Sequence, residues 1–78
     1  MALAGEERKR AAAGEGCLGK AHEHEPVFVL RAQDALAADL VELWAIRARA
    51  ASCPNDKVQE AMNLSEEMRR WPIRKNPD

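Results

Sequence analysis

The 78-residue sequence has little excess charge, few aromatic side chains and no long apolar run near its start. Its net charge of −1 gives no reason to expect general affinity for nucleic acids or acidic membranes, because that affinity needs a positive field. Residues 1–16 are charged from the sixth position and hold no apolar run, which argues against a signal peptide or a membrane anchor. We therefore expect a cytoplasmic protein without a membrane partner.

Residues that could carry catalysis or bind a metal are also scarce. Without an export signal, the two cysteines are expected to be free thiols. Cys17, His22 and His24 lie close together, and Cys53 could add a fourth ligand, but the paired-cysteine spacing typical of zinc sites is missing. Both histidines fall in one N-terminal segment, away from the serines that could act as nucleophiles. We predict no enzymatic activity, no metal site and no cofactor.

The stretch "GEGCLGKA", residues 14–21, has the glycine spacing of a phosphate-binding loop. Such a loop also needs a preceding strand, a helix that begins at the lysine, and a Ser or Thr hydroxyl for magnesium. Here Ala21 occupies the hydroxyl position, the preceding "EERKRAAA" is not strand-like, and Pro26 prevents a long helix afterwards. We expect chance glycine spacing in a flexible arm and no bound nucleotide.

Composition divides the chain into three parts. Residues 1–25 hold all four glycines and almost no large apolar side chains, so we expect a flexible or loosely docked N-terminal arm with at most a transient helix. Residues 26–73 hold the core-forming side chains, and residues 74–78 form a polar C-terminal tail. Within the middle part, "VFVLR", residues 27–31, is rich in β-branched and aromatic side chains. This strand-like segment is expected to pack on helices or to pair with the same segment of a second copy.

An amphipathic helix is predicted over residues 35–50, with Asp34 as its N-cap. Its apolar face consists of Leu36, Leu40, Leu43 and Trp44. Acidic Asp39 near its start and basic Arg47 and Arg49 near its end match the helix dipole.

A second amphipathic helix is predicted over residues 55–71, where Pro72 ends it. Its candidate capping residues are Ser52, Asn55 and Asp56. Its apolar stripe consists of Val58, Ala61, Leu64, Ser65, Met68 and Trp71. Glu66 is spaced to pair with Arg70 across one turn.

Two amphipathic helices joined by a short linker predict an antiparallel helical hairpin, and hence a mainly α fold. Phe28, Trp44 and Trp71 are the large side chains expected to close its core. The core-forming side chains are few for the number of residues that must be ordered. This shortage favours a partner surface or a homodimer.

Two surfaces are candidates for binding. A protein–protein interface is expected to use side chains that the monomer cannot cover: Phe28, Leu30, Trp44, Met68 and Trp71. The alternative is nucleic-acid binding by a basic C-terminal cluster: Arg69, Arg70, Arg74 and Lys75. Glu60, Glu66 and Glu67 on the outer face of the second helix would repel phosphates, so protein–protein interaction is favoured.

With "EGCLGKA", "EPVFVLRAQDALA" and "MRRWPIRKNPD" in view, the chain resembles a group of small uncharacterised proteins of bacteriophages, prophages and related proteobacterial genomes. The likeness covers residues 14–78 and carries no assigned activity, so it assigns no functional residue. It implies a phage-related cytoplasmic accessory protein that acts by binding. It also favours docking of residues 14–21 on the hairpin or on a partner.

Overall fold

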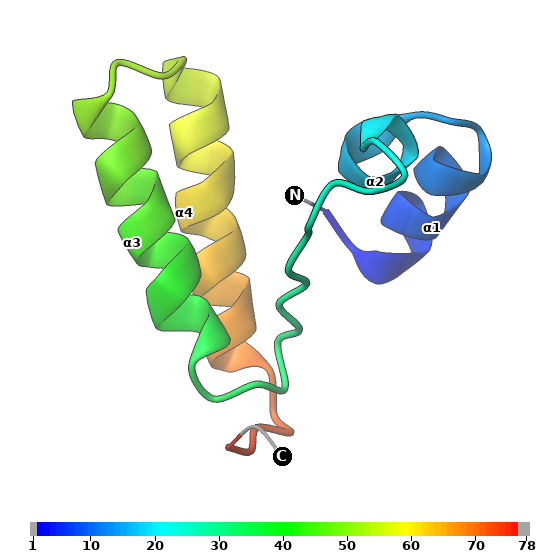
Figure 1. Ribbon diagram of the computed structural model, residues 1–78. Helices are drawn as coiled ribbons and strands as arrows, with labels where there is room; N and C mark the ends of the chain where they lie inside the picture. The colour runs from blue at the N-terminus through cyan, green and yellow to red at the C-terminus, as the bar shows by residue number, and fades with distance from the viewer. Residues whose placement is uncertain (1, 77–78) are drawn as a thin grey trace.

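The structure, a computed structural model, describes residues 2–76 and arranges them as two pairs of helices (Figure 1). In chain order the helices are α1 (Ala4–Ala12), α2 (Gly16–Lys20), α3 (Ala37–Ala50) and α4 (Asn55–Arg70). α1 packs on α2 and α3 packs on α4, and within the described residues no helix of one pair packs on a helix of the other. The predicted mainly α fold with an antiparallel helical hairpin is confirmed by α3 and α4.

α3 begins at Ala37, slightly later than predicted, and Asp34 is not its N-cap. The carboxylate of Asp34 instead accepts a hydrogen bond from the backbone N–H of Leu36 at 2.8 Å, which closes a turn just before the helix. The carbonyl of Asp34 also accepts the N–H of Ala37 at 3.1 Å. Asp34 therefore shapes the entry to α3, but its side chain bonds to no N–H group of the helix itself.

α4 begins at Asn55 as predicted, but no side chain caps it. This corrects the prediction, which named Ser52, Asn55 and Asp56 as candidate caps. The carbonyl of Pro54 accepts the backbone N–H groups of Lys57 and Val58, both at 3.1 Å. α4 ends at Arg70, since Trp71 is extended ahead of Pro72.

The turn between α3 and α4 is closed by carbonyls from the last turn of α3. Ser52 has a left-handed φ of 62°, and its N–H donates to the carbonyl of Arg49 at 3.0 Å. The N–H of Cys53 donates to the carbonyl of Ala48, also at 3.0 Å. These two bonds form a Schellman ending, in which glycine usually occupies the left-handed position.

Small side chains form the interface between α3 and α4. The buried apolar residues are Ala37, Ala38, Val41, Ala45 and Ala48 on α3 and Val58, Ala61 and Met68 on α4. Ser65 lies among them with its polar group satisfied, because its hydroxyl donates to the carbonyl of Met62 at 2.7 Å. The predicted orientation of α4 is confirmed, since most of its apolar stripe is buried.

α3 faces α4 with a different side from the one predicted. The expected inner face, which consists of Leu36, Leu40, Leu43 and Trp44, is 44–53% exposed. The alanine side of α3 is buried instead. Both sides of this helix are apolar, but alanines allow two helix backbones to approach closely, and the small stripe of α4 fits that approach.

The large aromatic side chains lie outside the core, contrary to the prediction that they would close it. The exposed fractions are 83% for Phe28, 48% for Trp44 and 51% for Trp71. Phe28 precedes α3 and Trp71 follows α4. Because neither residue belongs to a helix, the helix periodicity does not place its side chain in the interface between α3 and α4. Because alanine buries little area per residue, the resulting core is thin.

The N-terminal arm contains α1 and α2, although no residue of either helix is buried. α1 also has a Schellman ending: Gly14 has a φ of 72°, and the N–H of Glu15 donates to the carbonyl of Arg10 at 2.7 Å. α2 then passes close to this turn, since a Cβ on Gly19 would lie 2.7 Å from the carbonyl carbon of Gly14. The glycine spacing predicted to be chance therefore has a structural reason in the turn and the helix contact.

An extended linker connects α2 to α3 and meets the C-terminal segment at the base of the hairpin (Figure 1). An isolated parallel bridge joins Asp34 and Lys75. The N–H of Lys75 donates to the carbonyl of Gln33, and the N–H of Ala35 donates to the carbonyl of Lys75, both at 2.7 Å. We call this contact between residues 33–35 and 74–75 the C-terminal clasp.

The predicted polar tail, residues 74–78, is partly docked by the clasp. The guanidinium of Arg74 donates to the carbonyl of Ala35 at 3.0 Å and reinforces the backbone bonds. Pro77 and Asp78 lie outside the described residues. The tail therefore contributes to the closure of the hairpin at the end opposite its turn.

Candidate functional site

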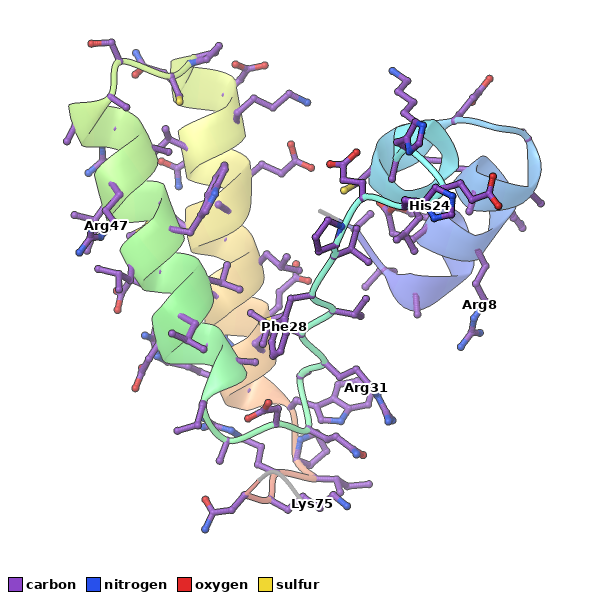
Figure 2. All side chains as sticks on the ribbon, viewed as in Figure 1. Arg8, His24, Phe28, Arg31, Arg47 and Lys75 are labelled. Atoms are coloured by element: carbon purple, nitrogen blue, oxygen red, sulfur yellow. The ribbon has the colours of Figure 1, made fainter. Side chains whose placement is uncertain are left out.

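The five residues predicted to bind a partner do not form one exposed site. Met68 is buried in the core, and Leu30 is half-buried against it. Phe28, Trp44 and Trp71 are exposed. In Figure 2, Phe28 projects from the linker toward α4. The three aromatic residues are thus available to a partner, whereas Met68 and Leu30 pack within the chain.

α3 carries an apolar surface that was predicted to lie inside the hairpin. We call Leu36, Leu40, Leu43 and Trp44 the outer α3 face. Their spacing of four, three and one residues aligns them along one side of the helix. Arg47 lies beside them and points away from α4 in Figure 2. A row of small residues at positions 37, 41, 45 and 48 was the sequence signal for the buried side.

The chain exposes more surface than a compact protein of its size. Its accessible surface is 6217 Å², whereas a compact monomer of 8.7 kDa exposes roughly 4,700 Å². Its radius of gyration is 13.2 Å, against about 11.5 Å for a compact domain of this length. The excess of roughly 1,500 Å² exceeds the area of about 800 Å² that one partner buries in a standard protein interface.

Arg69, from the predicted basic cluster, is engaged between the two helices of the hairpin. Its guanidinium donates to Asp39 at 3.1 Å and to Glu42 at 2.8 Å. These hydrogen bonds, first to Asp39 and then to Glu42, raise the pKa of Arg69 above its ordinary value. The two carboxylates neutralise the positive charge of Arg69, which would otherwise attract a phosphate group.

The other members of the basic cluster are also held within the chain. Arg70 pairs with Glu66 at 3.4 Å, which confirms the predicted pair. Arg74 donates to a backbone carbonyl, and the backbone of Lys75 forms the clasp. The cluster is therefore divided between the end of α4 and the base of the hairpin.

Cys17, His22 and His24 do not assemble a metal site. Within residues 2–76, no group of three or more His, Cys, Asp or Glu side chains is arranged to hold a metal ion. The rings of His22 and His24 lie 5.8 Å apart, and Nδ1 of His22 accepts the backbone N–H of His24 at 3.2 Å. That bond occupies one of the ring nitrogens that could bind a metal. Cys17 is exposed and Cys53 half-buried, both as free thiols.

A shallow pocket of about 240 Å³ lies between the N-terminal residues and α4. Its lining consists of Ala2, Leu3, Glu6, Arg10, Glu60, Asn63, Leu64 and Glu67. This volume is below the range of about 300–1,000 Å³ typical of ligand sites. The lining holds no Ser, Thr, Cys or His side chain.

Comparisons with protein-family models, with curated proteins and with solved structures found no match. Among the described residues, no helix is both long and apolar enough to cross a membrane. The functional proposal therefore depends on the surface of the chain itself.

Proposed function

We propose that this chain is a small non-enzymatic protein–protein interaction module, a phage-related accessory protein of the cytoplasm. The observation that carries the proposal is the outer α3 face, a row of large apolar side chains left half-exposed beside an alanine core. A contiguous exposed apolar surface of this kind is typical of an interaction site. The phage-related role rests on the resemblance carried by segments such as "EPVFVLRAQDALA".

The outer α3 face is large enough to contribute usefully to binding. Full burial of one such side chain stabilises by about 1.5–3 kcal/mol, so covering its exposed half contributes about 1 kcal/mol. The four side chains together would then contribute about 4 kcal/mol before the cost of association. The exposed aromatic residues Phe28 and Trp71 are further candidates for the same interface.

Nucleic-acid binding, the alternative, has less support because Arg69 and Arg70 are already paired with carboxylates. It predicts salt-dependent retention of the chain on a phosphate or heparin matrix. Retention that is lost when the four basic residues are replaced by Ala would favour this alternative: Arg69, Arg70, Arg74 and Lys75.

The interaction proposal is tested by capture from a bacterial lysate with the full chain as bait. In a double variant, Leu40→Glu with Leu43→Glu, two charges lie on the outer α3 face and outside the core. We expect the wild-type chain to retain a protein in near-stoichiometric amount and the variant to lose it. Far-UV circular dichroism checks that the variant keeps its helices.

The matched control changes charge on the exposed polar face of α4. Glu66→Gln with Glu67→Gln is expected to leave capture unchanged, because these exposed side chains belong to α4 and not to the outer α3 face. Equal capture by wild type and by the Leu40→Glu, Leu43→Glu variant would contradict the proposal.

A further inference from the structure

The linker segment, residues 26–30, combines unpaired backbone with exposed apolar side chains. Among the residues that the structure describes, the backbone groups of Val27, Phe28, Val29 and Leu30 make no hydrogen bond. The side chains of Val27, Phe28 and Val29 are 53%, 83% and 66% exposed. Figure 1 shows this segment descending alone from α2 to the base of the hairpin. Extended backbone with free N–H and C=O groups is a template for strand pairing.

The sequence around Phe28 is complementary to itself in one antiparallel register. When Phe28 faces Phe28 of a second copy, Val27 faces Val29 of that copy. In the same register Glu25 faces Arg31, which places opposite charges together at both ends of the pairing. Arg31 points away from the hairpin in Figure 2 and makes no ion pair among the described residues. It is therefore free to meet the carboxylate of Glu25, whose Oε1 accepts the backbone N–H of His22 at 3.1 Å and whose Oε2 can accept from Arg31.

Pro26 decides which backbone groups would bond. Facing residues in an antiparallel pair alternate between hydrogen-bonded and non-hydrogen-bonded positions. If Phe28 takes a non-bonded position, so does Pro26, and its missing N–H removes no bond from the ladder. Val27 and Val29 then take bonded positions and exchange both of their N–H···O bonds across the pair. The opposite phase would place Pro26 where an N–H is required.

We propose that the partner of this chain is a second copy, which pairs antiparallel with the linker segment about Phe28. The proposal rests on the proposed interaction function and names its partner. The contact is isologous, with a two-fold axis between the two Phe28 residues.

Leu30 connects each paired segment to the core of its own hairpin. Leu30 packs against the hairpin core, and Phe28 lies on the same side of an extended chain. A two-stranded ribbon alone is marginal in water, but one that packs on helices can be stable. We therefore expect a dimer that dissociates on dilution.

Disulfide trapping tests the register in the full chain with Cys17→Ala and Cys53→Ala. Phe28→Cys is expected to form a covalent dimer on mild oxidation, since facing Cα atoms at a non-bonded position lie about 4.5 Å apart, within disulfide range. Val27→Cys is the matched control, because residue 27 faces residue 29 and not itself. A mixture of Val27→Cys and Val29→Cys chains is expected to give the mixed dimer. Self-linking of Val27→Cys as readily as Phe28→Cys would overturn the register.

Exchanging the charges at positions 25 and 31 tests the ends of the pairing, with dimer formation measured by sedimentation equilibrium. Arg31→Glu places two carboxylates at each end and is expected to raise the dimer dissociation constant about fivefold at low salt. Adding Glu25→Lys to the same chain restores opposite charges and is expected to restore the dimer. The absence of any rescue in the double variant would count against the pairing.

Two further variants separate this proposal from the general interaction function. Val29→Pro removes a bonded N–H and is expected to abolish the dimer, whereas the Leu40→Glu, Leu43→Glu variant is expected to keep it. The reverse result would overturn the linker contact and assign the dimer to the outer α3 face. A wild-type chain that sediments as a monomer throughout the micromolar range would end the self-pairing proposal and leave lysate capture to decide the interaction function.

Discussion

The α1–α2 arm and the α3–α4 hairpin end their first helices in the same way but are held together differently. Each first helix closes with a Schellman ending, at Gly14 in the arm and at Ser52 in the hairpin. The arm buries none of its helical residues, whereas the hairpin encloses a row of alanines and an interhelical Arg69 bridge. Local hydrogen bonds are thus enough to reverse a chain, but burial distinguishes a stable pair of helices from a marginal one.

Helix length sharpens this difference. α1 and α2 have 9 and 5 residues, and α3 and α4 have 14 and 16. Isolated helices shorter than about 12–15 residues are marginal in water. We therefore expect the arm to open locally while the hairpin stays folded, and amide exchange would measure the two separately.

The largest expected effect is overpacking of the hairpin by Ala61→Leu. Ala61 is fully buried, so a larger side chain must push the helices apart and lower the free energy of unfolding by about 3 kcal/mol. Urea unfolding followed by far-UV circular dichroism measures the change. Ala12→Leu on the exposed surface of α1 is the control, with a change within about 0.5 kcal/mol. Similar losses of unfolding free energy for both variants would show that the two helix pairs do not differ in how they are packed.

A smaller effect, confined to the arm, is expected from Gly14→Ala. Because residue 14 has a left-handed φ, a Cβ there costs about 1 kcal/mol. Amide exchange in α1 and α2 should become faster while the urea midpoint of the hairpin stays the same. A lower midpoint for the hairpin would mean that the two pairs unfold together.

The corresponding change in the hairpin, Ser52→Gly, is expected to stabilise. Glycine relieves the left-handed strain at φ 62° but increases the freedom of the unfolded chain, which leaves a net gain of about 0.5 kcal/mol. Thermal unfolding measures it as a small rise in Tm. Ser52→Ala keeps the Cβ and should give no such rise.

The smallest effect is expected from Arg69→Gln, which removes the charged bridge to Asp39 and Glu42. The variant should unfold at slightly lower urea at low salt, and the difference should shrink at high salt. Because the pKa of Arg69 is raised in the folded chain, the stability that the bridge contributes is fully present below the ordinary arginine pKa. It is lost only as the pH rises through the raised pKa, so it persists at neutral pH. Arg70→Gln, at an exposed pair, is the control with no measurable change.

The number and positions of the hairpin helices could be predicted from the sequence because apolar side chains recur with helical period and Pro72 marks an end. The buried side of α3 could not be predicted in the same way. Leu40 and Ala45 lie on two apolar sides of one helix, and size alone favoured the leucine side. Only the fit to the small stripe of α4 selects the alanine side.

The candidate site was predictable to a similar degree. Phe28, Trp44 and Trp71 were predicted both to close the core and to bind a partner, and their exposure agrees only with the second role. The outer α3 face as a whole was predicted to lie inside the hairpin. The bridge from Arg69 to Asp39 joins residues thirty positions apart and depends on how α3 and α4 are aligned along each other, which sequence spacing does not give. The role of Gly19 likewise depends on a backbone that approaches from outside its own helix.

The C-terminal clasp has a consequence for synthesis of the chain. Residues 74–75 fasten the entry of α3, yet a ribosome adds them after both helices of the hairpin. A nascent chain can form the turn between α3 and α4 before that fastening exists. The open end of the hairpin is then secured only after α4 has been made, so pairing of the two helices can precede closure of their base.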